Sequence, residues 1–363
     1  MSLAPDITEL LARARADLRL GLGIVLADGD RGALVLAAEG LSPARLAEVL
    51  TLGGTPVLAI TARRAATLKA RAYDGDVARI RLPEDATPSW IASVADPADD
   101  LRVPMKGPLA AMREGPAHLH RLALKLAKSA RILPAAVVLD LPAPHTFARE
   151  ANLTLIDAIA ATPVLADLSP MHPVVSARVP IEASEAGRVH VFRPDDGGEE
   201  HYAIEIGKPP RDASVLARLH SACFTGDVLG SLKCDCGPQL RGALAQMGAQ
   251  GAGVLLYLNQ EGRGIGLANK MRAYSLQDQG FDTVEANHRL GFEDDERDFR
   301  IGSDILKRMG FRSVRLLTNN PAKIAMMEAT GITVTERVPL KVGETAHNRA
   351  YLATKARKSG HLL

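Results

Sequence analysis

The sequence predicts an α/β (α+β) protein of two domains, each a mixed sheet with flanking helices. Its 363 residues exceed the usual length of one domain. Stretches with helical apolar spacing alternate with short apolar runs in the first half, and strands of alternating polarity open the second half. A Pro-rich passage, ATPVLADLSPMHPVV, lies between the halves and is typical of a linker. We therefore place the domains at residues 1–165 and 174–363.

In the first domain, apolar residues at helical spacing predict a helix over 7–20, ended by Gly21 and Gly23. A second helix begins where Ser42 can serve as N-cap and Pro43 as the first helical residue. A third helix is expected within 118–132, and the segment NLTLIDAIAA closes the domain. The expected strands are GIVLADGD, ALVLAAE, PVLAIT and AAVVLDL.

In the second domain, ARVPIEASEAGRVHVFRP and EEHYAIEIG predict antiparallel strands, and VLARLHSACF predicts a further strand. GVLLYL and SVRLLT have the composition of buried strands. Four helices are expected in CGPQLRGALAQMGAQG, ANKMRAYSLQDQG, GSDILKRMG and NNPAKIAMMEATG. Asn319 or Asn320 would cap the last helix, with Pro321 in its first turn.

The overall composition narrows the class of protein. Hydrophobic residues make up 47% of the chain, which suffices for packed cores, and aromatic residues only 4%. A formal net charge of +2 predicts neither nucleic-acid nor membrane binding. The N-terminus lacks the apolar core of a signal peptide, and no apolar run approaches the ~20 residues that span a bilayer. We therefore expect a cytoplasmic protein with reduced thiols.

All three cysteines, Cys223, Cys234 and Cys236, lie in one short stretch, which indicates a metal site. An odd count argues against a disulfide framework, and three ligands leave one position of a tetrahedral zinc open. One alternative is three buried cysteines that act as small hydrophobic residues. Another is a closed structural zinc completed by His220.

Several other segments contain residues that could bind a ligand or take part in catalysis, and each also has a purely structural interpretation. QEGRGIGL offers Arg263 and close backbone approach to phosphate, or is an ordinary Gly-rich turn. LLTNNPAKI offers Thr318 and Lys323 at a helix N-terminus, or is a simple cap. FEDDERDFR pairs Asp295 with Arg297, or is a solvated charged loop. Tyr274 in YSLQDQG has a phenol that could orient a water.

Taken together, these segments closely resemble GTP cyclohydrolase II, the first enzyme of riboflavin biosynthesis. The resemblance covers about residues 174–363, and its segments occur in the family's order. They include RLHSACFTGD, SLKCDCG, QEGRGIGL, RAYSLQDQGFDTVEANHRLGF, DERDF, RLLTNNPAKI, ERVPL and the terminal GHLL. The combination is far more specific than any one of its motifs.

The resemblance implies a catalytic zinc held by the three cysteines, with a bound water that attacks C8 of guanine. A second hydrolysis would release that carbon as formate, so the products are 2,5-diamino-6-(5-phosphoribosylamino)pyrimidin-4(3H)-one, formate and pyrophosphate. Tyr274 would position the water and the ring. Arg297 is the implied nucleophile at the α-phosphorus with Asp295 as the neighbouring base, although a protonated guanidinium is equally suited to stabilising phosphoryl charge.

The resemblance also implies the binding of GTP, with Mg²⁺ accompanying the triphosphate, in a homodimer. One position departs from the family pattern: residue 222 is Ala where a Glu is common, which puts GTP affinity in doubt if that Glu contributes its side chain. The implied GTP contacts are Arg218, Leu219, His220, Ser221, Ala222, Gln239, Glu261, Gly262, Arg263, Thr283, Thr318 and Lys323.

Residues 1–165 resemble a degenerate 3,4-dihydroxy-2-butanone 4-phosphate synthase domain. Of the acid-rich segment that binds Mg²⁺ in that family, only Asp28, Asp30 and Glu39 are acidic here. A Gly-His-Thr-Glu motif is replaced by GPAHLH, which lacks the Glu. Too few carboxylates are left to hold Mg²⁺ and move protons, so we expect a catalytically inactive domain that serves packing, dimerisation or regulation.

Two other functions stay open at this point. One is a paralogous hydrolase that acts on GTP or a related ligand in another pathway, which Ala222 permits. The other is a non-catalytic nucleotide-binding regulator with a structural zinc. Intact Tyr274, Asp295 and Arg297 argue against the regulator, because a binding protein has no need of them.

Overall fold

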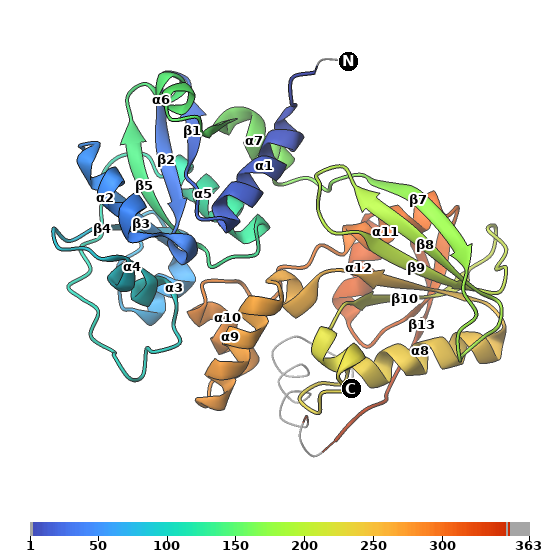
Figure 1. The fold of residues 1–363 in the computed structure, drawn as a ribbon. Helices are drawn as coiled ribbons and strands as arrows, with labels where there is room; N and C mark the ends of the chain where they lie inside the picture. Colours follow the sequence, from blue (N-terminus) through green and yellow to red (C-terminus); the bar gives the residue numbers. More distant parts are fainter. Residues whose placement is uncertain (1–2, 346–347, 349–363) are drawn as a thin grey trace. The chain divides into compact units, whose positions relative to one another are not determined.

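The computed structural model describes residues 3–345 and 348, and the chain forms two compact units. Unit 1 comprises Met1–Asp167 and Ile265–Glu296, and unit 2 comprises Leu168–Gly264 and Arg297–Leu363. Each unit contains one mixed sheet with helices packed on it (Figure 1). The predicted fold class is therefore confirmed.

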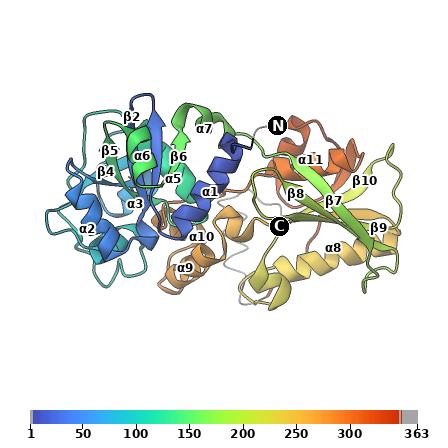
Figure 2. The ribbon, with the colours of Figure 1, turned by 45° about the horizontal axis from the view of Figure 1, so that its top comes forward.

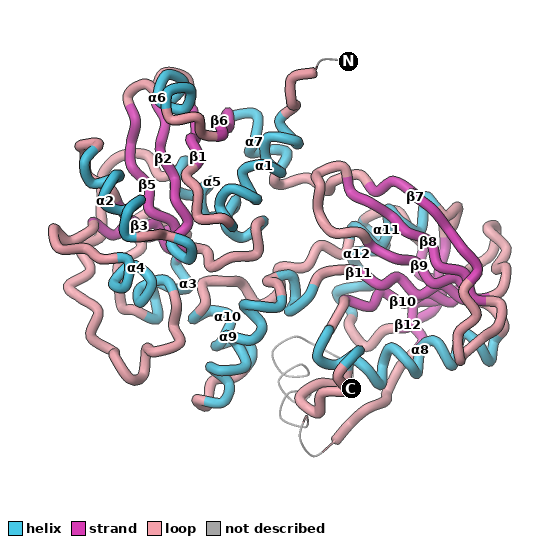
Figure 3. Tube along the Cα trace, in the orientation of Figure 1, coloured by secondary structure: helices cyan, strands magenta, loops and turns pink. Residues whose placement is uncertain are grey.

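The sheet of unit 1 has six strands in the order β4-β3-β5-β2-β1-β6. Only β1 and β6 pair in parallel, and the other neighbours are antiparallel. The strands appear in magenta in Figure 3. Their bounds are β1 Ile24–Asp28, β2 Arg31–Ala37, β3 Val57–Thr61, β4 Val77–Arg81, β5 Ala135–Leu141 and β6 Thr154–Asp157.

Successive strand residues point to opposite faces of this sheet, so it has two separate apolar cores. Helices α1 (Ile7–Arg19), α5 (His118–Ser129) and α7 (Ala158–Val164) cover one face. The other face is covered by the helices α2 Pro43–Thr51, α3 Ala62–Thr67, α4 Pro88–Ala95, α6 Pro144–Glu150, α9 Leu267–Asp278 and α10 Thr283–Arg289.

The helices α9 and α10 lie far from the rest of unit 1 in the sequence. Leu276 of α9, and Leu290 and Phe292 just after α10, are each 1% exposed and belong to the same core as the strands β3, β4 and β5. The compact units therefore differ from a simple division near residue 170. A segment from the second half of the chain packs within the first unit.

The sheet of unit 2 has seven strands in the order β13-β12-β10-β11-β9-β8-β7. The first four in this order run parallel, and β9, β8 and β7 continue the sheet antiparallel (Figure 2). Their bounds are β7 Met171–Arg178, β8 Gly187–Pro194, β9 His201–Ile206, β10 Val215–Ser221, β11 Gly253–Leu258, β12 Ser313–Leu317 and β13 Thr333–Val338.

Helix α8 (Cys236–Gln250) packs on one face of this sheet, and α11 (Arg300–Arg308) and α12 (Pro321–Ala329) pack on the other. The parallel strands β10, β11 and β12 end at the same edge. In open sheets of parallel strands, ligands bind at the carboxyl edge. The loops that follow these strands are therefore the natural place for a site.

Several local expectations can be compared with the structure. Ser42 caps α2 and Asn320 caps α12 through their side chains, as the sequence indicates, whereas Asn319 instead bonds the backbone of Leu340. The predicted linker was too long, because α7 extends to Val164 and β7 begins at Met171. The terminal GHLL lies outside the described residues. Within the described part of the chain, no helix is both long enough and apolar enough to cross a bilayer.

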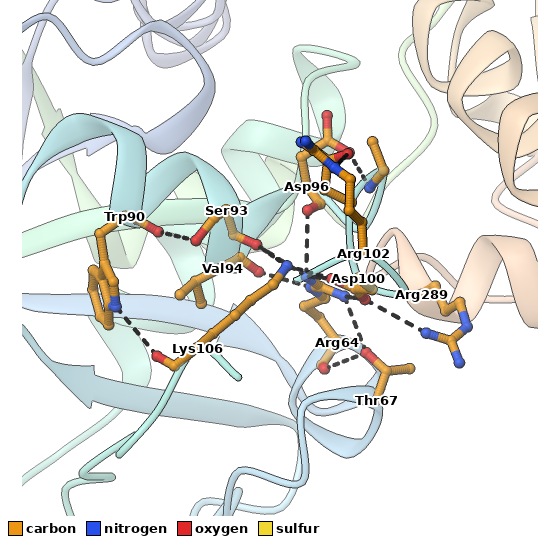
Figure 4. A network of polar contacts seen from close by, with 12 residues as sticks. Arg64, Thr67, Trp90, Ser93, Val94, Asp96, Asp100, Arg102, Lys106 and Arg289 are labelled. Carbon is orange, nitrogen blue, oxygen red and sulfur yellow. Dashed lines mark hydrogen bonds and ion pairs between the residues drawn. The ribbon is translucent and has the colours of Figure 1, made fainter. Parts of the chain in front are cut away.

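A buried charge network fixes the loop that follows α4 in unit 1 (Figure 4). The guanidinium of Arg64 is 1% exposed and donates to both carboxylate oxygens of Asp100, at 2.5 and 2.9 Å. Lys106 donates to the same carboxylate, and Arg289 of α10 approaches it at 3.5 Å. One carboxylate thus joins α3, the loop and α10.

Candidate metal centre and anion site

The three cysteines converge at the carboxyl edge of the unit 2 sheet. Their sulfur atoms all lie within 4.8 Å of one another, and the Sγ atoms of Cys223 and Cys234 are 3.8 Å apart. Cys223 follows β10, and Cys236 is the first residue of α8. Cys223 and Cys234 are buried, with 5% and 6% of their surface exposed. Among the described residues, no histidine or carboxylate ligand atom joins this group.

Two glycines allow the thiols to come this close. A Cβ added at Gly226 would lie 2.8 Å from Sγ of Cys234 and 3.1 Å from Sγ of Cys223. A Cβ at Gly237 would lie 2.1 Å from the carbonyl oxygen of Gly226. The short helical turn Phe224–Val228 and the start of α8 therefore touch backbone to backbone, and any side chain at Gly226 would fill the space between the sulfurs.

The chemistry of this donor set fits a divalent metal. The nearby thiols of Cys223 and Cys234, together with burial, raise the pKa of Cys236 well above its ordinary value. Three such thiols resist joint ionisation, and a bound cation removes that cost by neutralising the thiolates. Thiolates select soft or borderline ions such as Zn²⁺. With three protein ligands, one position of a tetrahedron stays available.

His220 belongs to a hydrogen-bond cluster around the carboxylate of Asp227, which also binds the backbone of Cys223. Its Nε2 lies 3.0 Å from the carboxylate of Asp227, and its ring stacks on Tyr257. Asp227 also accepts from the Tyr257 hydroxyl and from the backbone N–H of Cys223, each at 3.0 Å. Burial lowers the pKa of His220 despite the carboxylate. A closed site completed by His220 is therefore not what the geometry shows, because His220 lies outside the ligand group.

Asp227 is the site residue that sequence reasoning missed. Its side chain is 3% exposed and accepts from three donors on β10, β11 and the first cysteine. Groups that orient metal ligands in this way are often as important as the ligands. The available signal was an aspartate inside the turn between two presumed ligands, which is a weak one.

The loop after β11 joins the same edge. The carboxylate of Glu261 accepts the backbone N–H of Phe224 at 2.6 Å, next to Cys223, and the N–H of Gly262 at 3.0 Å. Arg263 has a φ of 62°, in the left-handed region that a residue with a Cβ rarely adopts. Such strain is concentrated at functional sites. The turn predicted from QEGRGIGL is thus a strained one.

A second chain of hydrogen bonds leads from Arg218 to Asp235. Its guanidinium donates to Gln239 at 2.5 Å and to the Leu317 carbonyl at 3.2 Å. Gln239 in turn donates to Asp235, which lies between two of the cysteines. Burial lowers the pKa of Arg218 to about 10, so it stays charged at neutral pH. Its Nε finds no acceptor within the described part of the chain.

Two further cations lie near the end of β10, each close to the ring of Phe299. Arg297 donates to the Ser221 hydroxyl at 3.3 Å, and its guanidinium lies 4.7 Å from the Phe299 ring. Lys323 donates to the Leu219 carbonyl at 2.8 Å and lies 4.9 Å from the same ring. These cations add positive charge to the edge that holds the cysteines.

The other residues that the sequence predicts for the site lie in different parts of the structure. The side chain of Leu219 is buried in the core, and Ala222 donates its N–H to the Leu258 carbonyl at 2.7 Å. Thr318 accepts the N–H of Asn320 at 3.0 Å and so serves the start of α12. Three residues belong to unit 1: Tyr274 on α9, Thr283 at the first position of α10, and the exposed Asp295.

The chain was compared with known proteins. Residues 172–339 match the family model of GTP cyclohydrolase II. A GTP cyclohydrolase-2 of Azospirillum brasilense is 46% identical over 359 residues, which cover 96% of this chain and 93% of that protein. This chain belongs to the GTP cyclohydrolase II family. It is accordingly a hydrolase, and the family resemblance predicted from the sequence is confirmed.

Other known proteins match a shorter part of this chain or resemble it in structure. The GTP cyclohydrolase-2 of Azotobacter vinelandii is 57% identical over 175 residues, 48% of this chain and 84% of that protein. The riboflavin biosynthesis protein RibBA of Bacillus subtilis is 55% identical over 177 residues, 48% of this chain and 44% of that protein. A crystal structure of RibBX, a two-domain 3,4-dihydroxy-2-butanone 4-phosphate synthase from A. baumannii, covers 85% of this chain and 93% of its own, with 17% identity and a TM-score of 0.33. A TM-score this low does not establish a common fold.

Proposed function

We propose that this protein is a zinc-dependent GTP cyclohydrolase II of riboflavin biosynthesis. It hydrolyses GTP to 2,5-diamino-6-(5-phosphoribosylamino)pyrimidin-4(3H)-one, formate and pyrophosphate. The observation that carries the proposal is the convergence of three thiols at the sheet edge that also holds Arg297 and Lys323, in a chain of this family. A zinc ion bound by the cysteines would supply Lewis-acid activation of water at its open position.

The residues around the thiols have separable roles in this proposal. Asp227 and Glu261 fix the backbone on either side of Cys223, and so hold the first ligand in place. Arg297 and Lys323 attract the triphosphate, whose Mg²⁺ neutralises part of its charge. A guanidinium stays protonated in proteins, so we assign Arg297 to stabilising charge on the α-phosphoryl group rather than to nucleophilic attack.

Three residues of unit 1 are also proposed to act in the reaction. Tyr274 orients the guanine ring and a water, Asp295 accepts a proton, and Thr283 contacts GTP. The other proposed GTP contacts are Arg218, Leu219, His220, Ser221, Ala222, Gln239, Gly262, Arg263 and Thr318. We further propose a cytoplasmic homodimer that takes GTP as a small-molecule substrate and has no nucleic-acid partner.

The N-terminal part of unit 1 is proposed to be a catalytically inactive scaffold. Two of its three remaining acids, Asp28 and Glu39, are in ion pairs: Asp28 lies 2.8 Å from His118, and Glu39 pairs with Arg272 of α9 at 3.0 Å. The Azospirillum relative, which matches almost the whole chain, is named only for the cyclohydrolase. Conversion of ribulose 5-phosphate by the purified protein with Mg²⁺ would show that the domain is active after all.

The scaffold supports the segment that carries Tyr274, Thr283 and Asp295. Partly exposed ion pairs such as Arg272–Glu39 contribute at most about 1 kcal/mol each. Burial of Leu290 and Phe292 in the shared core contributes about 1.5–3 kcal/mol for each side chain. Apolar burial therefore dominates, and the ion pairs set the orientation of the helices.

One assay separates the candidate functions. The protein is incubated with GTP, Zn²⁺ and Mg²⁺, and formate, pyrophosphate and the pyrimidine are quantified. We expect all three products, and Cys234→Ser should abolish formate release. Pyrophosphate without formate would indicate a paralogous hydrolase, an outcome that Ala222 makes worth testing. GTP recovered unchanged would contradict the proposal and favour a nucleotide-binding regulator.

A further inference from the structure

Unit 1 contains a cavity of about 620 Å³ that is separate from the cysteine centre. Its walls come from α3, from α5, from the adjoining ends of β3 and β4, and from His288 of α10 and Glu293. Ligand cavities of small organic molecules typically measure about 300–1,000 Å³. All of the lining residues belong to unit 1.

The cavity wall is mainly positive. On α5, Lys125 and Lys128 follow Arg121 by four and seven residues. One face of this helix therefore presents three cations. Arg63 of α3 adds a fourth. The lining contains only two carboxylates, so an anion is favoured over a cation in this space.

Three of these cations pair with carboxylates: Lys128 pairs with Glu296 at 2.6 Å, and the other two pairs are more exposed. Arg63 pairs with Glu293 at 2.7 Å, with 45% and 52% of the two side chains exposed, and Arg121 pairs with Asp76 at 2.7 Å. Exposed pairs of this kind contribute at most about 1 kcal/mol. A doubly charged phosphate group forms stronger, charge-assisted hydrogen bonds with arginine and can replace a surface carboxylate. Lys125 has no ion pair or hydrogen bond with the described residues.

The rest of the lining suits a carbon skeleton. Ala62, Ala66, Val77 and Leu124 provide an apolar patch beside the cations. Inorganic phosphate alone would leave this patch uncovered. A ligand with one charged end and an apolar or sugar-like body would match both parts of the wall.

We propose that this cavity binds a small organic phosphomonoester, with the phosphate held by Arg63, Arg121 and Lys125. The phosphate would take Arg63 from Glu293, which precedes Asp295 by two residues. Ligand binding is thereby coupled to the segment that we assign to the GTP reaction, and the cavity is a regulatory site. This coupling rests on the proposed function, whereas binding itself does not.

Binding is tested by isothermal titration calorimetry of the full chain with inorganic phosphate, ribose 5-phosphate and AMP as probes, and with ribose and adenosine as uncharged controls. We expect at least one phosphomonoester to bind more tightly than inorganic phosphate. Arg121→Ala and Lys125→Ala should each weaken binding about tenfold or more, since a charge-assisted contact is lost. Lys208→Ala, an exposed lysine of unit 2, removes the same charge and should leave binding unchanged.

The proposal is overturned if none of the three probes binds, if ribose or adenosine binds equally well, or if the Arg121→Ala and Lys125→Ala proteins bind like the wild type. Coupling is tested by formate release from GTP with and without the bound probe. We expect a change in rate that Lys125→Ala removes, and an unchanged rate would overturn the regulatory role. A protein that binds the probe but releases no formate from GTP would contradict the proposed function and leave the binding site established.

Discussion

Replacing Gly226 with Ala tests the geometry of the thiol cluster directly. The added methyl would lie 2.8 Å from Sγ of Cys234, 2.9 Å from Cβ of Cys236 and 3.1 Å from Sγ of Cys223. Favourable contacts of such atoms are about 3.5–4.0 Å long, so the sulfurs must move apart. Overpacking of this kind costs about 1–3 kcal/mol. The metal-bound arrangement of the three sulfurs carries this cost, so we expect zinc affinity to fall about five- to 150-fold.

The measurement is zinc affinity by competition with a chromophoric chelator, together with the free energy of unfolding of the metal-free protein. Gly242→Ala in α8 is the matched control, because its methyl would make ordinary contacts of 3.4 Å or longer. An alanine in a helix stabilises by about 0.5–1 kcal/mol relative to glycine. Gly226→Ala protein that binds zinc as tightly as the wild type would refute the account of the cluster.

Three further predictions concern the surroundings of the site and the scaffold. In Asp227→Asn, an amide N–H replaces one accepting oxygen and faces one of the three donors, so zinc affinity should fall about 10- to 100-fold. The exposed Asp212→Asn should leave zinc affinity unchanged. Equal zinc affinities of the two variants would contradict the positioning role of Asp227. The free energy of unfolding of Arg263→Gly should exceed that of Arg263→Ala by about 1 kcal/mol, because only glycine is relaxed at a φ of 62°. Both variants should bind GTP more weakly than the wild type. Unchanged GTP affinity would exclude Arg263 from the GTP site. Asp100→Asn leaves Arg64 and Lys106 without a carboxylate and should cost about 3 kcal/mol of unfolding free energy at neutral pH, whereas the neighbouring exposed Asp99→Asn should not shift the denaturation midpoint. Although burial opposes ionisation, the hydrogen bonds and charges of Arg64 and Lys106 hold the pKa of Asp100 below its usual value, so its contribution is present above the unfolded pKa of about 3.9 and lost as pH falls further. The difference between wild type and Asp100→Asn should therefore shrink in denaturation curves below about pH 4, and a constant difference would contradict this assignment.

The sequence was most informative where the deciding interactions are local. Capping by Ser42 and Asn320 depends on residues within one turn, so composition and spacing sufficed. The cysteines could be assigned to one cluster because the chain between them is short. Short apolar runs, and alternating runs at the start of the second domain, likewise predicted most strands of both sheets.

What the sequence did not indicate depends on distant partners. Asp227 acts through His220, Tyr257 and the backbone of Cys223, which meet only when β10 and β11 pair. The apolar residues Leu290 and Phe292 show that their segment is buried, but not that the burying sheet lies more than a hundred residues earlier in the chain. Arg64 is a buried charge, and its partner Asp100 is identified only by the folded loop.

The central claim is that a zinc held by three cysteines is required for the opening of the GTP ring. The most direct measurement is formate release from GTP by metal-free protein as Zn²⁺ is added back in small steps. The account predicts no formate without metal, and a rate that rises linearly and levels off at one zinc per chain. Formate release from metal-free protein, or none from the zinc-loaded protein, would contradict it.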